Sequence, residues 1–384
     1  MNNPTEIIKS QIRDYGPITF AEFMESALYD PAHGYYSSGN SPIGREGDFY
    51  TSPHVHKAFG SVIGNFIIKS FNFMDEEDSS IIELGAGRGI LALDILDHIK
   101  TNNPKQYART NYYLVEQSND SRNESKKILA GHIEKVCWFS SLSEVDNKNI
   151  SGVIISNELF DALPFHRLKI TNGSLSESYI TLDDHGNLSE ITDKPSCKEL
   201  IEYFNKIDMD FAEDQEFEIS LKAKTLLNEI DRVLRKGFIL TIDYGYLADE
   251  LFNPERMKGT FKCIHKHTIN ETPYINIGQQ DITAHVDFSN LIRAGESLNI
   301  KKVKYTTQGQ YLIDWGILDL IGNDLEENDK LKDFSAKDIQ AMKNLFLPEL
   351  MGDKFKVLVQ EKNLSEKINN FYPQSPFKIS FKVL

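Results

Sequence analysis

Three closely spaced glycines follow a short apolar run, and they constrain the fold more than any other feature of the chain. The apolar residues Ile81 to Leu84 predict a buried strand, and a helical pattern follows the glycines Gly85, Gly87 and Gly89. Glycines between a strand and a helix allow a tight turn in which backbone N–H groups approach a ligand. A dinucleotide-binding loop would need its third glycine at position 90, which is Ile90, so the spacing favours a nucleoside cofactor without a pyrophosphate over NAD.

Strand and helix patterns alternate after this loop. Further strand candidates are Tyr112–Val115, Val136–Phe139, Val153–Ser156, Phe238–Ile242, Lys301–Tyr305 and Phe355–Gln360. The order predicts an α/β fold with a Rossmann-like parallel sheet and crossover helices. A long insertion before Phe238 begins with two alternating stretches, His166–Ile170 and Ser178–Leu182, which predict a small β-rich cap.

An N-terminal segment precedes the sheet. Thr19 and Glu22 have the spacing of a capping box, which predicts that a helix begins after Thr19. The stretch 41–53 is rich in glycine, proline and aromatic residues, and we expect its part Gly47–Thr51 to form a lid over the cofactor. The expected division is a helical and lid segment 1–78, a catalytic domain 79–164 with 236–384, and an inserted cap or substrate lobe 165–235.

Charge and composition exclude several classes of protein. The formal net charge of −15 disfavours non-specific binding to nucleic acid, and no apolar run approaches the roughly 20 residues of a membrane span. Residues 1–16 match neither a secretory signal nor a transit peptide, so we expect a cytoplasmic protein. Three scattered cysteines and the absence of an HExxH pattern predict no metal site.

Polar residues follow several of the predicted strands. Glu116 comes directly after the second strand, where a carboxylate can bind ribose hydroxyls. Asn157, Glu158 and Asp161 follow the fourth strand, at the edge of the sheet where ligands bind in open α/β folds. The alternative for this segment is that Asn157 caps a helix whose dipole favours the acids. Asp243 ends the fifth strand in the same way.

Together these motifs resemble the MidA family of class I S-adenosylmethionine-dependent methyltransferases over nearly the whole chain. The resemblance rests on Gly16–Phe20, Tyr29–Tyr36, Gly47–Pro53, Glu83–Gly89, Asn157–Pro164, Asp243–Gly245 and Asp281–Phe288. The family often has proline where this chain has Ala86. Since its mitochondrial member is an arginine methyltransferase needed for respiratory complex I assembly, the resemblance implies a protein arginine N-methyltransferase that uses S-adenosylmethionine. Two alternatives stay open, a small-molecule methyltransferase and an assembly factor that binds the donor without turnover.

The predicted site has two parts. The expected cofactor-binding residues are Gly47, Asp48, Phe49, Thr51, Glu83, Gly85, Gly87, Gly89, Glu116 and Asn157. Methyl transfer is an in-line displacement, and a protonated guanidinium needs carboxylates that orient it, so Glu158 and Asp161 are the first catalytic candidates. A second group for substrate contact or proton removal is Asp281, His285 and Asp287. The expected partner is a protein with a target arginine, and the chain could pair as a homodimer.

Overall fold

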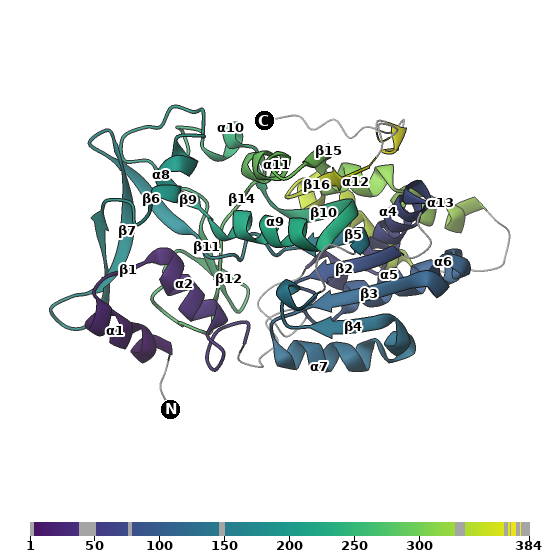
Figure 1. The fold of residues 1–384 in the computed structure, drawn as a ribbon, viewed down its shortest axis with the longest axis horizontal. Coiled ribbons are helices and arrows are strands. Elements are labelled where there is room, and N and C mark those ends of the chain that lie inside the picture. The colour runs from purple at the N-terminus through teal and green to yellow at the C-terminus, as the bar shows by residue number, and fades with distance from the viewer. Residues whose placement is uncertain are drawn as a thin grey trace. The chain divides into compact units, whose positions relative to one another are not determined.

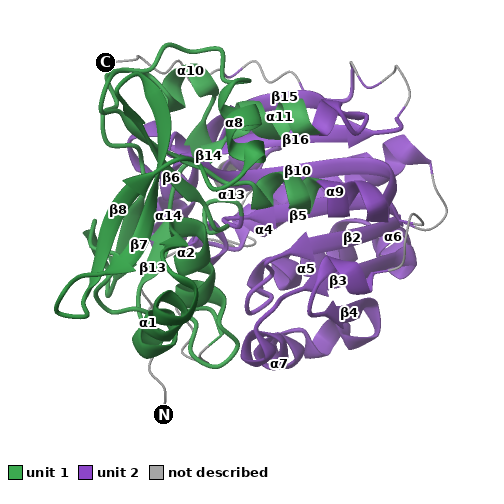
Figure 2. Cartoon of the chain, turned by 60° about the vertical axis from the view of Figure 1, so that its left-hand side comes forward, with its two compact units in different colours: residues 1–49, 160–227, 245–294 green, residues 50–159, 228–244, 295–384 purple. Residues whose placement is uncertain are grey.

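The computed structural model of the chain describes residues 4–37, 51–75, 79–145, 150–326, 335–364, 368, 370–373 and 377. It contains two compact units, which Figure 2 colours separately. Unit 1 comprises residues 1–49, 160–227 and 245–294, and unit 2 comprises residues 50–159, 228–244 and 295–384. This division differs from the three segments that the sequence predicts. Phe20, Ile180 and Ile282 come from three different segments but share one buried core, so the N-terminal helices, the insertion and a later segment form a single unit.

Unit 2 contains the expected Rossmann-like sheet (Figure 1). Its strands are β2 (Ser79–Leu84), β3 (Thr110–Val115), β4 (Val136–Phe139), β5 (Ile150–Asn157), β10 (Leu234–Tyr246), β15 (Ile300–Thr307) and β16 (Phe355–Lys362). They lie in the order β15-β16-β10-β5-β2-β3-β4. The predicted strands are all present, and β2, β3, β4, β5 and β10 are parallel. The two later strand candidates add an antiparallel part to the sheet, because β16 runs antiparallel between β10 and β15.

Unit 2 also contains helices. They are α3 (Ser52–Val55), α4 (Ala58–Met74), α5 (Ile90–Asn102), α6 (Pro104–Arg109), α7 (Asn119–Ile128), α12 (Gln308–Asp314), α13 (Ile317–Glu326) and α14 (Ala336–Phe346). Helix α9 (Lys222–Val233) begins in unit 1 and ends in unit 2. Helices α4 and α5 pack closely because α4 has Gly60 at the contact, where a Cβ would lie 2.4 Å from Cβ of Asp94. Short helical turns η1 (Ala130–Lys135), η2 (Leu142–Glu144) and η3 (Pro348–Gly352) complete the unit.

Unit 1 is built on a small antiparallel sheet. Its strands are β1 (Ile18–Thr19), β6 (His166–Thr171), β7 (Ser174–Leu182), β8 (Leu188–Asp193) and β9 (Glu216–Ile219). A second sheet contains β11 (Lys262–His265), β12 (Thr268–Asn270) and β13 (Asp281–Thr283), and β14 (Val286–Asp287) pairs with the last residues of β10. The helices are α1 (Pro4–Tyr15), α2 (Phe20–Tyr29), α8 (Lys198–Phe204), α10 (Ala248–Leu251) and α11 (Phe288–Glu296). The predicted β-rich insertion is therefore confirmed.

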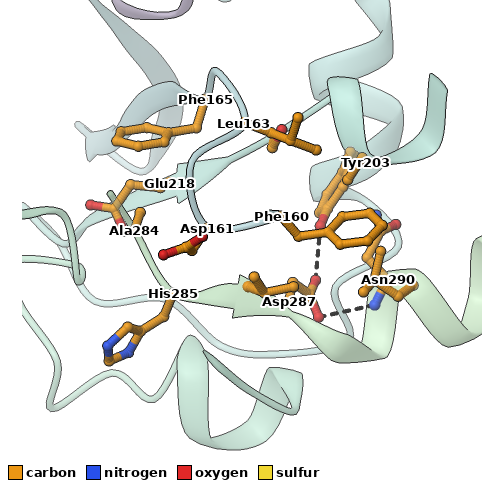
Figure 3. A pocket seen from close by; sticks show the side chains of 14 residues that line it. Phe160, Asp161, Leu163, Phe165, Tyr203, Glu218, Ala284, His285, Asp287 and Asn290 are labelled. Carbon is orange, nitrogen blue, oxygen red and sulfur yellow. Dashed lines mark hydrogen bonds between the residues drawn. The ribbon is translucent and has the colours of Figure 1, made fainter. Parts of the chain in front are cut away.

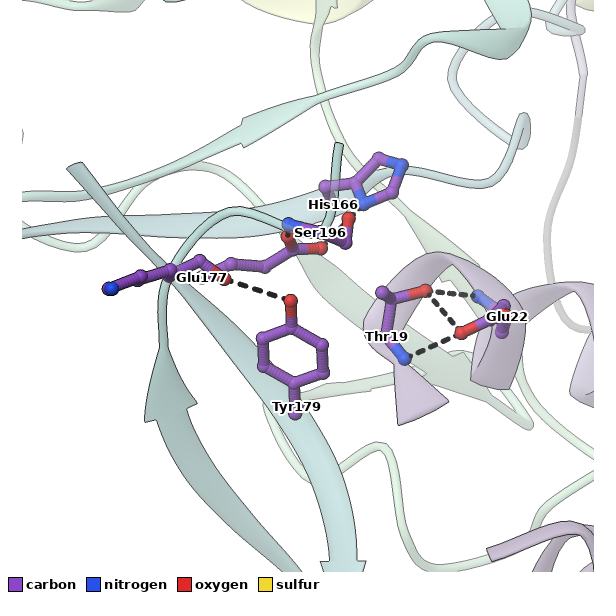
Figure 4. Close-up of polar contacts among 7 residues, drawn as sticks. Thr19, Glu22, His166, Glu177, Tyr179 and Ser196 are labelled. Carbon is purple, nitrogen blue, oxygen red and sulfur yellow. Dashed lines mark hydrogen bonds and ion pairs between the residues drawn. The ribbon is translucent and has the colours of Figure 1, made fainter. Parts of the chain in front are cut away.

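Two local polar clusters in unit 1 lie at the start of α2 and in the antiparallel sheet (Figure 4). The Thr19 hydroxyl accepts from N–H of Glu22, and the Glu22 carboxylate accepts from N–H of Thr19 at 2.8 Å, so the predicted capping box is confirmed. In the sheet, Nδ1 of His166 lies 2.6 Å from Oε1 of the fully buried Glu177. Burial alone would raise the pKa of Glu177, but hydrogen bonds from His166 and Ser196 hold it below its ordinary value.

Candidate functional site

The glycine loop of unit 2 has the backbone that only glycine adopts readily. Gly85, Gly87 and Gly89 have φ angles of 65°, 51° and 77°, and α5 begins at the next residue. A Cβ at Gly89 would lie 3.0 Å from Cβ of Ser125, so this glycine lets α7 pack closely. A Cβ at Gly87 would meet no atom of the described residues within 4 Å. Gly87 therefore faces open space, as the loop of a ligand site requires.

Glu116 is tied to this loop. Its Oε2 accepts from N–H of Gly87 at 2.8 Å, and its Oε1 accepts from N–H of Ser118 at 2.7 Å. Burial raises the pKa of Glu116, and the hydrogen bonds from Ser118 and Gly87 partly offset that rise. A carboxylate oxygen has two lone pairs, so each oxygen keeps capacity for a ribose hydroxyl. The geometry fits a nucleoside held between the loop and Glu116.

Glu83 occupies a different environment from the other predicted cofactor residues. It is buried in β2, and its Oε2 accepts from the Tyr112 hydroxyl of the neighbouring strand at 2.5 Å. Burial raises the pKa of Glu83 to about 8, which the hydrogen bond from Tyr112 opposes. Its carboxyl group is therefore largely protonated at neutral pH and holds two strands together. A direct role in cofactor binding stays a prediction.

The segment after β5 is a turn rather than a helix. Glu158 has φ of 52°, a left-handed conformation that is uncommon for a residue other than glycine, and its N–H donates to the carbonyl of Ile242 at 2.9 Å. The next regular element along the chain is β6, so the alternative that Asn157 caps a helix is wrong. Strained backbone of this kind concentrates at functional sites. The turn places the Glu158 side chain at the carboxyl end of β5.

Residues before α4 reach the same edge of the unit 2 sheet. Oε1 of Glu158 accepts from N–H of Ser52 at 3.3 Å and from Nδ2 of Asn157 at 3.1 Å. Next to Ser52, the hydroxyl of Thr51 lies 2.6 Å from Nδ1 of His54. The structure thus brings Thr51, Asn157 and Glu158 into one connected cluster. The predicted lid residues Gly47, Asp48 and Phe49 lie outside the described residues.

Asp243 is a site residue whose role the sequence only partly indicates. It is fully buried, its Oδ2 accepts from N–H of Leu159 at 3.1 Å, and its Oδ1 accepts from N–H of Tyr244 at 2.9 Å. Asp243 therefore fixes the turn that carries Glu158. The position of an acid at the end of the fifth strand was the available signal, but no pattern in the sequence indicates its backbone partners.

The remaining predicted acids lie in unit 1, where two of them are tied to hydroxyl groups. Oδ2 of Asp161 accepts from the Thr283 hydroxyl at 2.9 Å. Oδ1 of Asp281 accepts from the Tyr36 hydroxyl at 2.8 Å. Burial, followed by the charge of Asp281, raises the pKa of Tyr36 well above its ordinary value. Asp161 and Asp281 are both buried, so unit 1 concentrates carboxyl groups in its interior.

A pocket in unit 1 collects three carboxyl groups and several aromatic rings (Figure 3). Its lining includes Asp161, Glu218, Asp287, His285, Tyr203 and Phe160. Asp287 accepts from the Tyr203 hydroxyl at 2.9 Å and from N–H of Asn290 at 3.0 Å, so it also stabilises the first turn of α11. Burial raises the pKa of both Glu218 and Asp287. The sequence did not indicate Glu218 or Tyr203, which come from the inserted segment.

Within the described ranges, no three His, Cys, Asp or Glu side chains are grouped so that they could hold a metal ion. Among the helices that the structure describes, none has the length and apolar character needed to cross a membrane.

A Rossmann-like sheet whose glycine loop is hydrogen-bonded to an acid at the end of the next strand defines a nucleoside-binding fold of the methyltransferase class. Residues 62–306 match the model of a family of S-adenosyl-L-methionine-dependent methyltransferases, and the chain belongs to this family. The protein is therefore an S-adenosylmethionine-dependent methyltransferase, with the Rossmann-like sheet that the sequence predicts.

Relatives of known name and structure agree with this class. The chain is 29% identical over 314 residues to the protein arginine methyltransferase NDUFAF7 homolog of Caenorhabditis elegans, covering 76% of this chain and 71% of the relative. It is 26% identical to human NDUFAF7, a mitochondrial protein arginine methyltransferase, covering 90% and 80%. It also resembles a Burkholderia thailandensis protein solved with bound S-adenosyl-homocysteine, with a TM-score of 0.84, 25% identity and coverage of 97% and 95%.

Proposed function

We propose that this methyltransferase modifies an arginine side chain of a protein partner. The observation that carries the proposal is the unit 1 pocket, in which Asp161, Glu218 and Asp287 meet aromatic side chains. A guanidinium is a planar cation with five N–H donors, and it is favoured by carboxylates and by aromatic faces. The names of the relatives support the same acceptor, since both are called protein arginine methyltransferases.

Burial makes the ionisation of two carboxyl groups in this pocket depend on a nearby cation. It raises the pKa of both Glu218 and Asp287, which means that ionising them without a counter-charge is costly. An entering guanidinium would supply a counter-charge that favours their ionised forms. A neutral or anionic acceptor would gain nothing from this arrangement.

The chain's own residues supply the positioning that methyl transfer needs. S-Adenosylmethionine brings the methyl group as a sulfonium, and the loop Gly85–Gly89 with Glu116 fits its nucleoside half. We assign Glu158 to orient the acceptor nitrogen. Glu158 lies at the carboxyl end of β5, and β5 pairs with β2, the strand that leads into the glycine loop. Asp161 is the other first candidate, and Asp281, His285 and Asp287 form the second group. A cytoplasmic location and a homodimer stay predictions.

The experiment is to identify the methylated atom. The purified chain is incubated with S-adenosylmethionine carrying a deuterated methyl group and with extract from cells that lack the protein. Tryptic peptides are then examined by mass spectrometry, with the Glu158→Gln variant as control. The expected result is label on arginine in a small set of peptides, reduced in the variant. Label in a soluble metabolite, or donor binding without any labelled product, would overturn the proposal.

A further inference from the structure

Three buried polar atoms near the glycine loop have no hydrogen-bond partner among the residues that the structure describes. They are Nε2 of His54, Nε of Arg88 and Oδ1 of Asn157. Buried polar groups are normally paired, and each exception calls for an explanation, such as a ligand. Nothing in the family match or in the glycine motif assigns a role to His54 or Arg88.

Contacts within unit 2 place these three residues around one edge of the sheet. Asn157 donates to Glu158, Glu158 accepts from N–H of Ser52, and Thr51 contacts His54 at 2.6 Å. Arg88 belongs to the glycine loop itself, and its charge acts on His54. One nitrogen of the Arg88 guanidinium pairs with Glu124 of α7 at 2.6 Å, which fixes the group beside the loop.

The sheet order gives the direction of the donor across this edge. Strand β2 lies between β3 and β5, and the glycine loop leaves the end of β2. Glu116, which suits the ribose, follows β3, whereas Asn157 ends β5. A donor whose ribose meets Glu116 therefore extends its other end toward the β5 side. That end is an amino acid, with one carboxylate and one ammonium group.

The chemistry of the three atoms matches these two groups. Arg88 Nε is a donor only, and the Asn157 amide oxygen is an acceptor only. Burial, together with the charge of Arg88, lowers the pKa of His54, so its imidazole is neutral near pH 7. When the Thr51 hydroxyl donates to Nδ1, the proton of a neutral imidazole lies on Nε2, which then donates.

We propose that Arg88 and His54 bind the carboxylate at the amino-acid end of the donor, and that Asn157 accepts from its ammonium group. Thr51 is a positioning residue that sets the tautomer of His54. The site distinguishes the complete donor from adenosine derivatives that lack the amino-acid end. This assignment concerns the donor alone and is independent of which acceptor is methylated.

The test compares two ligands by isothermal titration calorimetry on the full chain. S-Adenosylhomocysteine has the amino-acid end, and 5′-methylthioadenosine shares the nucleoside and sulfur but lacks it. We expect each of three variants, Arg88→Gln, His54→Phe and Asn157→Ala, to lower the affinity for S-adenosylhomocysteine by about tenfold or more, the effect of losing a charge-assisted hydrogen bond. The affinity for 5′-methylthioadenosine should change by less than about threefold. Binding of the second ligand also shows that each variant is folded.

A matched control separates recognition from structure. Glu124→Gln breaks the same ion pair that Arg88→Gln breaks but keeps the Arg88 donors, so it should leave the preference between the two ligands intact. If the three variants lower the affinity for both ligands equally, the residues stabilise the loop and do not bind the amino-acid end of the donor. Unchanged affinity for S-adenosylhomocysteine, as expected if only water fills the site, would also overturn the proposal.

Discussion

The backbone N–H of Gly87 donates a 2.8 Å hydrogen bond to the carboxylate of Glu116. The two residues follow neighbouring parallel strands, β2 and β3, so one hydrogen bond couples the shape of the loop to the position of the ribose-binding acid. This hydrogen bond fixes the loop and the acid relative to each other, which reduces the ordering cost of binding a nucleoside.

Gly87→Val should abolish S-adenosylhomocysteine binding and leave most of the fold intact. Among the residues that the structure describes, the new Cβ meets no atom within 4 Å, so the side chain would occupy the space that a ligand needs. The φ of 51° also strains any β-branched residue. Gly173→Val is the matched control, since Gly173 has φ of 69° and equally open surroundings in the β6–β7 hairpin. Calorimetry should show lost binding only for the first variant. Wild-type affinity in Gly87→Val would refute the loop assignment.

Glu83 should make stability depend on pH. Because burial raises its pKa to about 8, the folded protein holds this proton more tightly than the unfolded chain does. The stabilisation is complete below the ordinary glutamate pKa and is lost as the pH rises through about 8. Glu83→Gln keeps an acceptor for Tyr112 and removes the titration. In urea unfolding, the free energy of unfolding of the variant should therefore rise relative to that of wild type as the pH increases from 5 to 9, by at most about 5 kcal/mol. Parallel pH profiles would contradict the expectation.

Glu158→Gln should separate binding from turnover. The amide oxygen can still accept from Ser52, so donor affinity should stay near wild type, whereas loss of charge should lower turnover by at least about tenfold, or roughly 1.4 kcal/mol of barrier. Single-turnover methyl transfer to the identified acceptor measures this. If turnover survives here and collapses in Asp287→Asn or His285→Ala, the acceptor is oriented by the unit 1 group instead.

Thr19→Ala should loosen the start of α2. It removes a side-chain acceptor for N–H of Glu22, a change that costs about 1 kcal/mol at a helix N-cap. Hydrogen exchange should therefore quicken at the Glu22 amide. Glu22→Gln is a milder control, because its amide oxygen can still accept from Thr19. Equal exchange in wild type and Thr19→Ala would show that packing alone holds this helix end.

Local sequence patterns predicted the helices and strands better than they predicted which distant residues contact one another. Ile81–Leu84 and the following glycines were sufficient to predict a strand, a loop and a helix, because chain direction and backbone freedom are local properties. The contact between Ser52 and Glu158, and that between Tyr36 and Asp281, join residues far apart in the chain, so no spacing could indicate them. Asp287 was predicted as a substrate residue, yet its contacts with Tyr203 and Asn290 give it a place in the fold as well.

The antiparallel strand β16 has a consequence for biosynthesis. It lies between β10 and β15 in the sheet, yet residues 355–362 come after both strands in the chain. Until they emerge, β10 lacks its second neighbour and presents open backbone groups to other chains. The sheet is therefore complete only after residues 355–362 have been made, and a chain truncated before Phe355 leaves that edge exposed to aggregation.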